Sequence, residues 1–159
     1  MNNKLMFSSN SNEWATPQDF YDRLNKFCNF TLDPCSDGIN NKCDKYFTIN
    51  DDGLKQDWSN EIVFVNPPYG REIKLWVKKC YDESLKGVKI VLLIPARTDT
   101  SYQHDYVYKS DYICFLRGRL KFGDSKNSAP FPSQLVFFNI NIDEEFKKHL
   151  NKIGKLIKL

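Results

Sequence analysis

Short apolar runs alternate with segments in which apolar residues recur every three or four positions. The runs at 62–65 and 89–95 are almost wholly apolar, which is typical of strands that are buried on both faces of a sheet. Briefer apolar stretches have the same strand-like pattern. The full set of expected strands is 30–32, 46–49, 62–65, 89–95, 112–116 and 134–140.

A helix is expected to begin after Thr16, ahead of the first strand. Thr16 has the side chain of a helix cap, and Pro17 suits the first helical position, where its missing N–H is not needed. Phe20, Leu24 and Phe27 then follow with helical spacing. The segment is therefore predicted to be a short helix with one apolar face.

Two further helices follow from the same spacing. One covers about 73–85 and ends at Gly87, and the other begins near Asp143. Buried strands that alternate with helices are typical of α/β proteins. The pattern predicts a mostly parallel, twisted sheet that is flanked by helices.

Length and composition narrow the class of protein. The chain has 159 residues, of which 41% are hydrophobic, enough for one compact domain at 12–159 behind a loose segment at 1–11. No apolar run approaches the ~20 residues of a membrane helix. The first ten residues lack the apolar core of a signal peptide, so a cytoplasmic location is expected. The five cysteines form no CxxC pair, which argues against both a disulfide framework and a metal site.

Charge is distributed unevenly along the chain. Residues 13–61 carry ten acidic and five basic residues, whereas residues 62–159 carry seventeen basic and ten acidic ones. A solvated surface explains such asymmetry, and so does a polyanion that binds the later part of the chain.

Two polar motifs follow predicted strands directly. Asp33-Pro34 ends the strand at 30–32, and Asn66-Pro67-Pro68-Tyr69 ends the strand at 62–65. Ligands of open α/β sheets bind beyond the carboxyl ends of the parallel strands. We therefore expect both motifs to contribute to one site at this edge.

The motif at 66–69 suits transfer of a group to a weakly nucleophilic amine. The Asn66 side-chain carbonyl and the Pro67 backbone carbonyl are two acceptors for the hydrogens of such an amine, and they stabilise the positive charge that develops on it. Pro68 stiffens the turn, and Tyr69 offers a ring on which a base can stack. A turn that only ends the strand is the alternative.

The motif resembles the Asp/Asn/Ser-Pro-Pro-Tyr/Phe signature of amino-group methyltransferases that use S-adenosylmethionine. Further segments resemble the phage-type DNA N6-adenine methyltransferases, relatives of Dam, in the same order. They are NEWATP (12–17), TLDPC (31–35), DGL with Trp58 (52–58), NPPYG (66–70), PARTDT (95–100), and RLKF with APFPS (119–133). The resemblance implies a Rossmann-like methyltransferase fold. The Gly-rich Phe-x-Gly-x-Gly loop of many such enzymes is absent.

The resemblance also implies which residues bind the cofactor. These are Trp14, Thr16, Pro17, Asp33, Pro34 and Asn66, with S-adenosylmethionine as the cofactor. A carboxylate at a strand end suits a cationic amino-acid ligand, which favours this role for Asp33, although Asp33 also suits a turn. The Asp51-Asp52-Gly53 segment is explained by a turn alone, and a carboxylate that reaches the cofactor ribose is the second interpretation.

Basic residues in two later loops, 97–110 and 117–133, are candidates for contact with double-stranded DNA. They are Arg97, Arg117, Arg119 and Lys121, and Phe131 is expected to be an exposed aromatic ring beside them. A surface pair with Asp99 is the alternative for Arg97, and a buried loop anchor is the alternative for Phe131.

The resulting hypothesis is methylation of the N6 amino group of adenine in DNA by a monomer or a homodimer, in the host cytoplasm if a phage encodes it. The target adenine must leave the duplex, because its amine is base-paired. Two alternatives stay open. One is a methyltransferase that acts on an RNA base or on a protein glutamine amide. The other is a catalytically silent DNA-binding relative.

Overall fold

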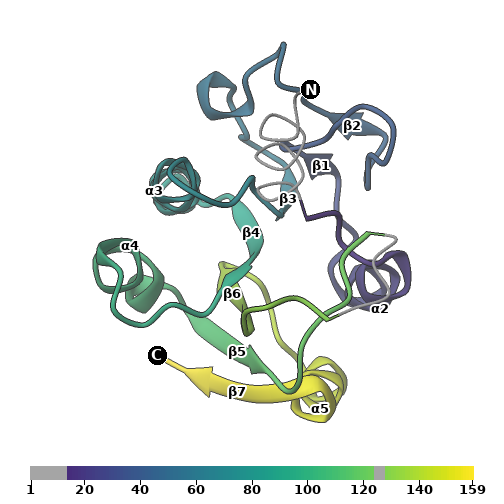
Figure 1. Cartoon of the computed structure of the whole chain (residues 1–159), viewed down its shortest axis with the longest axis vertical. Coiled ribbons are helices and arrows are strands. Elements are labelled where there is room, and N and C mark those ends of the chain that lie inside the picture. Colours follow the sequence, from purple (N-terminus) through teal and green to yellow (C-terminus); the bar gives the residue numbers. More distant parts are fainter. Residues whose placement is uncertain (1–13, 124–127) are drawn as a thin grey trace, which may run out of the picture.

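A computed structural model describes residues 14–123 and 128–159. The predicted loose segment, 1–11, lies outside these residues. Most elements occur where the apolar pattern predicts them (Figure 1). In chain order they are α2 (Gln18–Cys28), β1 (Leu32–Asp33), β2 (Lys45–Tyr46), η1 (Gly53–Lys55), β3 (Ile62–Val65), α3 (Ile73–Ser84), β4 (Lys89–Pro95), α4 (Ser101–Asp105), η2 (Val107–Lys109), β5 (Tyr112–Leu116), β6 (Ser133–Phe138), α5 (Glu144–Ile153) and β7 (Gly154–Lys158).

The strands form one sheet in the order β2-β1-β3-β4-β6-β5-β7. The pairs among β2, β1, β3 and β4 are parallel, whereas the pairs β4–β6, β6–β5 and β5–β7 are antiparallel. The predicted α/β architecture is confirmed, but the prediction of a mostly parallel sheet is wrong for this second half. The cause is β6, which returns from β5 and inserts between β5 and β4.

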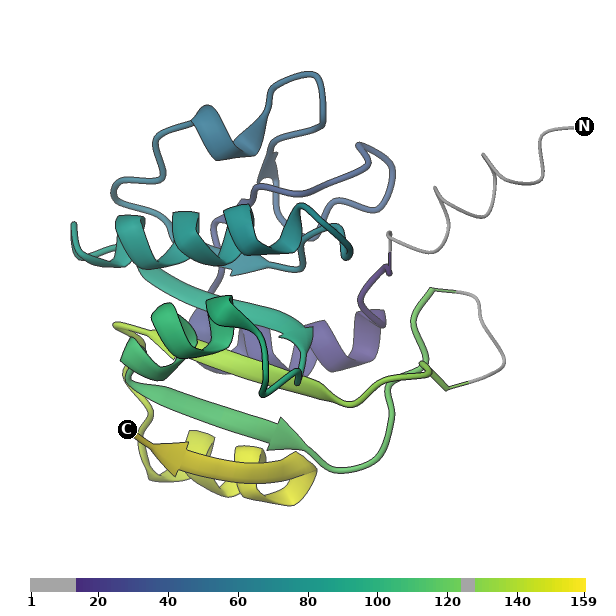
Figure 2. The same cartoon turned by 60° about the vertical axis from the view of Figure 1, so that its left-hand side comes forward.

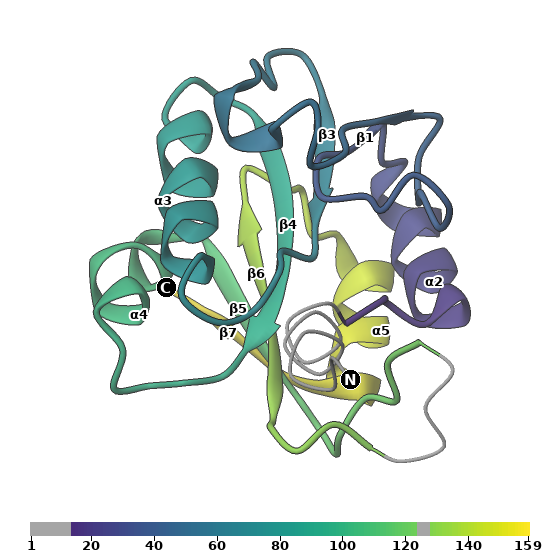
Figure 3. The ribbon, with the colours of Figure 1, turned by 45° about the horizontal axis from the view of Figure 1, so that its top comes forward.

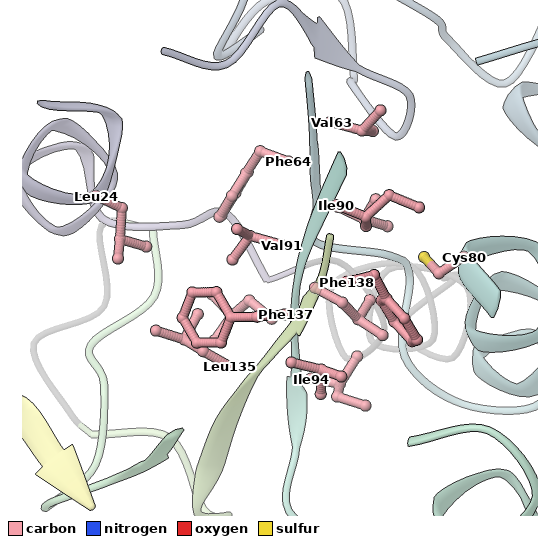
Figure 4. Close-up of a cluster of buried hydrophobic side chains, with 14 of the residues drawn as sticks. Leu24, Val63, Phe64, Cys80, Ile90, Val91, Ile94, Leu135, Phe137 and Phe138 are labelled. Atoms are coloured by element: carbon pink, nitrogen blue, oxygen red, sulfur yellow. The ribbon is translucent and has the colours of Figure 1, made fainter. Parts of the chain in front are cut away.

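Helices cover both faces of the sheet. Helices α3 and α4 lie on one face, and α2 and α5 lie on the other (Figures 1 and 3). Figure 2 shows the first pair in front of the strands and α2 behind them. Side chains of successive sheet residues point to alternate faces. Phe64, Val91 and Phe137 accordingly face Leu24 of α2, while Ile90 and Phe138 face Cys80 of α3 (Figure 4).

Three elements differ from the sequence prediction. Helix α2 begins at Gln18, with Pro17 at its N-cap and no side-chain cap, so Thr16 does not cap it. Residues 97–110, predicted as a loop, contain α4, which the Thr100 hydroxyl caps by accepting from the Gln103 N–H. Strand β7 was not predicted, because its five residues contain only two apolar side chains, Leu156 and Ile157, which are adjacent and do not alternate with polar ones. No helix of the described residues is long and apolar enough to cross a membrane.

Glu83, on α3, joins this helix to the loop that carries Trp58. The Glu83 side chain is 1% exposed and accepts hydrogen bonds from the Trp58 backbone N–H (3.0 Å) and from Lys79 Nζ (3.1 Å), and Lys86 Nζ lies 2.6 Å from its other oxygen. These partners outweigh burial and hold the pKa of the Glu83 carboxyl below its ordinary value. Glu83 is therefore an ionised anchor of the loop.

We expect Glu83→Gln to lower the free energy of unfolding by roughly 1.5–3 kcal/mol at neutral pH, the range for hydrogen bonds to charged groups. Because the folded-state pKa is lowered, this contribution is present above the ordinary pKa and is lost as pH falls through the lowered value. Urea titrations between pH 3 and pH 7 check both points. The variant and the wild type should converge in acid, and an equal difference at every pH would contradict the assignment.

Candidate active site

The carboxyl ends of β1 and β3 open into a cavity of about 450 Å³. The two strands are parallel neighbours, so the segments that follow them meet at one edge of the sheet. Residues from both predicted motifs line the cavity. The predicted site residues on its wall are Trp14, Thr16, Asp33, Pro34, Asn66, Pro67 and Pro68. Pro17 and Tyr69 are not on the wall.

Asn66 is held by three hydrogen bonds. Its Nδ2 donates to the Trp14 backbone carbonyl and to Thr16 Oγ1 (2.9 Å), and its Oδ1 accepts from the Tyr69 hydroxyl (3.1 Å). Both acceptors lie on the Nδ2 side of the amide, so the direction of Oδ1 is fixed. Thr16, which is 4% exposed, thus positions Asn66 instead of capping a helix.

Tyr69 lies behind the cavity wall, in an aromatic cluster. Its ring is 6% exposed and meets Phe131 edge-on at 5.4 Å and Phe122 at 6.3 Å, and Trp14 packs on the same two phenylalanines. Burial raises the pKa of the Tyr69 hydroxyl, which therefore stays a neutral donor. The expectation that Tyr69 offers a free stacking face is wrong for this structure.

Phe131 is also buried, with 7% of its surface exposed. The expectation of an exposed ring beside the basic residues is therefore wrong, and the alternative of a loop anchor is confirmed. Two of its partners, Trp14 and Tyr69, lie 117 and 62 residues before it in the sequence, and Phe122 lies nine residues before it, so the nearby basic residues gave no sign of this packing.

Asp33 closes the loop that follows β1. Its two carboxylate oxygens accept from the backbone N–H groups of Cys35 (3.3 Å) and Lys42 (2.9 Å). Burial raises the pKa of the Asp33 carboxyl, while these two hydrogen bonds and the Lys42 charge oppose the rise. A carboxylate has about four acceptor positions, so Asp33 retains capacity for a ligand on the cavity side.

Sequence reasoning missed most of the remaining wall, which comes from loops 35–54 and from the start of α3. Ser36, Asp37, Asn40, Lys42, Thr48 and Ile49 line it from the first loop, Asp52, Gly53 and Leu54 from its end, and Cys35, Phe64, Glu72 and Trp76 complete it. Two segments had a recognisable signal: residues 33–38, a reduced form of the Gly-rich cofactor loop, and Asp51-Asp52-Gly53. Asp52 faces the cavity, whereas Asp51 accepts from the Thr48 backbone N–H within its own turn (2.8 Å).

The wall is predominantly acidic. It carries the carboxyl groups of Asp33, Asp37, Asp52 and Glu72, against one ammonium group, that of Lys42. Hydrogen bonds from the backbone N–H groups of Asn40 and Ile39 lower the pKa of Asp37 despite its partial desolvation, so this group is ionised at neutral pH. A small ligand with a positive charge is therefore favoured over an anion.

Gly53 and two tryptophans make the floor rigid. A Cβ at Gly53 would lie 2.2 Å from the Pro34 carbonyl oxygen and 3.0 Å from Trp76 Cη2, so no larger residue fits there. Trp58 Nε1 donates to the Gly53 carbonyl (3.1 Å), and the Trp58 and Trp76 rings stack at 6.4 Å. Glu83 holds the Trp58 backbone and Trp58 holds Gly53, so Glu83 also helps to fix the floor of the cavity. Within the described chain the buried Trp76 Nε1 has no hydrogen-bond partner.

The predicted DNA-binding cations are exposed at the same edge of the sheet. Strands β3, β4 and β5 share one direction, because β6 is antiparallel to both β4 and β5. Arg97 follows β4 and Arg117 follows β5, so both lie at the edge that carries Asn66. No ion pair between Arg97 and Asp99 occurs in the structure, although both residues are described. Arg119 and Lys121 continue the loop after Arg117, and Arg119 donates to the Ala129 carbonyl (3.4 Å).

Metal chemistry finds no support in residues 14–123 and 128–159, since no group of three His, Cys, Asp or Glu side chains there is arranged to hold an ion. The five cysteines are free. The site therefore consists of a preorganised amide, an acidic cavity and a basic edge.

Several known proteins are similar to this chain in sequence. A DNA N-6-adenine-methyltransferase of Escherichia phage T1 is 30% identical over 91 residues, which are 56% of this chain but only 38% of that protein. The DNA N-6-adenine-methyltransferase of Haemophilus phage HP1 is 24% identical over 138 residues, 82% of this chain and 80% of its own. The putative methyltransferase YfdM of Escherichia coli K12 is 39% identical over 64 residues, 36% of this chain and 70% of its own. The model of the family "DNA N-6-adenine-methyltransferase (Dam)" matches residues 5–158, so the chain belongs to that family.

Proposed function

We propose that this protein transfers a methyl group from S-adenosylmethionine to the N6 amino group of adenine in DNA, with the target base flipped out of the duplex. One observation carries the proposal. The Asn66-Pro67-Pro68 turn and the Asp33-Pro34 turn line one cavity, so a methyl donor and an amine acceptor have adjoining places.

The cavity suits the proposed cofactor. Its volume of about 450 Å³ lies within the roughly 300–1,000 Å³ of small-molecule sites. S-adenosylmethionine carries a sulfonium and an ammonium group, and the surplus of carboxylates on the wall complements both. Asp33 is the proposed partner of the ammonium group, and Asp52 is the proposed partner of a ribose hydroxyl. The cofactor supplies the methyl group from its electrophilic sulfonium.

Asn66 and Pro67 hold the acceptor amine. The lone pair of an adenine amine is delocalised into the ring, so the nitrogen is a weak nucleophile. Hydrogen bonds from its two hydrogens to Asn66 Oδ1 and to the Pro67 carbonyl favour a tetrahedral nitrogen and stabilise the charge that develops on it. The nitrogen would gain the methyl group as the carbon–sulfur bond of the donor breaks to leave a neutral thioether, and it would release one proton to water.

The observed bonds of Asn66 explain how it is prepared for this task. A carbonyl oxygen has two lone pairs, so Oδ1 can accept from the Tyr69 hydroxyl and from the amine together. The two hydrogen bonds of Nδ2 already hold the Asn66 amide in place, so no free energy is spent on orienting it during the reaction. Tyr69 therefore acts as a positioning residue for Asn66 in this proposal.

The basic edge is the proposed contact for DNA phosphates. Each phosphate that a cation neutralises releases counterions, so affinity falls with salt. We expect the triple variant Arg117→Gln, Arg119→Gln, Lys121→Gln to weaken DNA binding and to reduce the slope of log affinity against log salt by roughly two to three. Fluorescence anisotropy at several salt concentrations measures both. An unchanged slope would place the DNA contacts elsewhere.

Methyl transfer tests the function itself. The protein is incubated with S-adenosylmethionine that carries a labelled methyl group and with duplexes of random sequence that contain or lack adenine. We expect label only in the adenine-containing duplexes. Label in both duplexes, or in neither, would contradict the proposal.

A further inference from the structure

A second hollow lies between α2 and α5, on the side of these helices that faces away from the sheet. It has a volume of about 370 Å³ and is lined by six residues. They are Arg23, Lys26 and Phe27 of α2, and His149, Lys152 and Ile153 of α5. We call this feature the α2–α5 groove.

The cations of the groove have no acidic partners. On α5 itself, Lys147 pairs with Glu144 and Lys148 pairs with Glu145. By contrast, no ion pair in the described residues involves Arg23, Lys26 or Lys152. Like charges that converge without counter-charges repel each other, and an anion between them removes that cost.

Helix dipoles do not account for this arrangement. A cation in the last turn of a helix is stabilised by the dipole, which explains Lys26 on α2 and Lys152 on α5. Arg23 lies in the middle of α2, and Asp19, four residues before it, is not paired with it. The dipoles thus explain two of the three cations that line the groove, and Arg23 is the one that they leave unexplained.

The floor of the groove is rigid and aromatic. The Phe27 ring stacks on Phe146 at 4.6 Å and on the His149 ring at 5.6 Å. Burial and the charges of Arg23, Lys152 and Lys26 lower the pKa of His149, so its ring is neutral at pH 7 and can still donate one hydrogen bond. The floor keeps the two helices, and hence their cations, at a fixed separation.

The groove is continuous with the basic edge of the proposed active site. The Arg117 backbone N–H donates to the Ile153 carbonyl (2.9 Å), which fixes the end of α5 against the loop that carries Arg117, Arg119 and Lys121. This loop runs past α5 towards α2 in Figures 1 and 3. The basic edge therefore adjoins the groove at Ile153, which lines it.

We propose that the α2–α5 groove binds the phosphates of duplex DNA on one flank of the methylated base. The inference rests on the proposed function and extends the DNA contact beyond the basic edge. Phosphate oxygens suit the guanidinium of Arg23 and the two ammonium groups, and a repeating polyanion matches a continuous basic path better than a single small anion does.

The test compares two triple variants with the same change in charge. Arg23→Gln, Lys26→Gln, Lys152→Gln removes the groove cations. The control, Lys89→Gln, Lys109→Gln, Lys158→Gln, removes three lysines that also form no ion pair in the described residues and that lie outside both the groove and the basic edge. DNA affinity is measured by anisotropy between 50 and about 200 mM salt. We expect the groove variant to lose roughly two to three units of salt slope and the control to lose none. Equal slopes for the two variants would overturn the proposal.

A second measurement distinguishes DNA from a small phosphate ligand as the occupant of the groove. If millimolar pyrophosphate raises the Tm of the wild type but not of the groove variant, while the DNA salt slope is equal in both, the groove is a small-anion site and the proposal is wrong.

A third measurement distinguishes failure of this proposal from failure of the proposed function. Methylation of DNA by the wild type is measured in parallel. Normal methylation with an unchanged groove slope overturns the groove alone, whereas absent methylation overturns the proposed function.

Discussion

Asn66→Ala should lower the turnover of methyl transfer by about 10²–10³, the loss seen when one preorganised group that stabilises transition-state charge is removed. The variant keeps the Pro67 carbonyl but lacks the acceptor that Tyr69 orients. It also lacks the donor to Thr16 and to the Trp14 carbonyl, so the free energy of unfolding should fall by about 1–3 kcal/mol. Single-turnover methylation and urea unfolding measure the two effects.

Two milder variants separate chemistry from stability. Tyr69→Phe removes only the hydroxyl that donates to Asn66 Oδ1, so turnover should fall less than in Asn66→Ala. Thr16→Val removes an acceptor for Nδ2 and should lower turnover by loosening the orientation of Asn66. A folded Asn66→Ala protein that methylates adenine at the wild-type rate would show that the motif is only a turn.

Asp33→Ala should weaken the binding of S-adenosylmethionine by about 10- to 150-fold, which corresponds to the roughly 1.5–3 kcal/mol of a hydrogen bond to a charged group. The same change frees the backbone N–H groups of Cys35 and Lys42, so the loop after β1 should also loosen. Calorimetric titration with the cofactor gives the affinity directly.

Asp33→Asn distinguishes the charge of this residue from its role in the loop. It keeps an acceptor for the loop but loses the negative charge, so affinity should still fall if the carboxylate pairs with the cofactor ammonium. Burial raises the pKa of Asp33, so wild-type affinity should decline on acidification at a higher pH than an ordinary aspartate would give. Asp33→Asn should lack that decline. Wild-type affinity in both variants would remove Asp33 from the cofactor site.

The apolar pattern was sufficient to predict the strands and helices that bury a continuous apolar surface. β3 and β4 are apolar on both faces because helices cover both, and the polar motifs at the ends of β1 and β3 meet as predicted because these strands are parallel neighbours. Strand direction in the second half of the sheet is not encoded in such runs. β6 is as apolar as β4, yet it lies antiparallel between β4 and β5.

The sequence did not reveal which side chains contact each other when they lie far apart along the chain. Thr16 has the features of a helix cap, but Asn66 lies 50 residues later and takes its hydroxyl. The residues next to Tyr69 and Phe131 in the sequence suggest that both rings are exposed for stacking. In the structure the two rings pack against each other and are buried. Most of the acidic wall comes from loop residues, and one of these loops is closed by the bond from the Lys42 N–H to Asp33, nine residues before it in the sequence.

The most direct measurement identifies the methylated product. The protein is incubated with S-adenosylmethionine in three separate reactions, which contain unmethylated DNA, unmethylated RNA or a protein pool. The products are digested, and the nucleosides and amino acids are analysed by mass spectrometry. The proposal predicts N6-methyladenine in DNA, strongly reduced in Asn66→Ala. Methylation confined to RNA bases or to glutamine would contradict it in favour of another substrate, and no methylation by a protein that binds DNA would identify a catalytically silent relative.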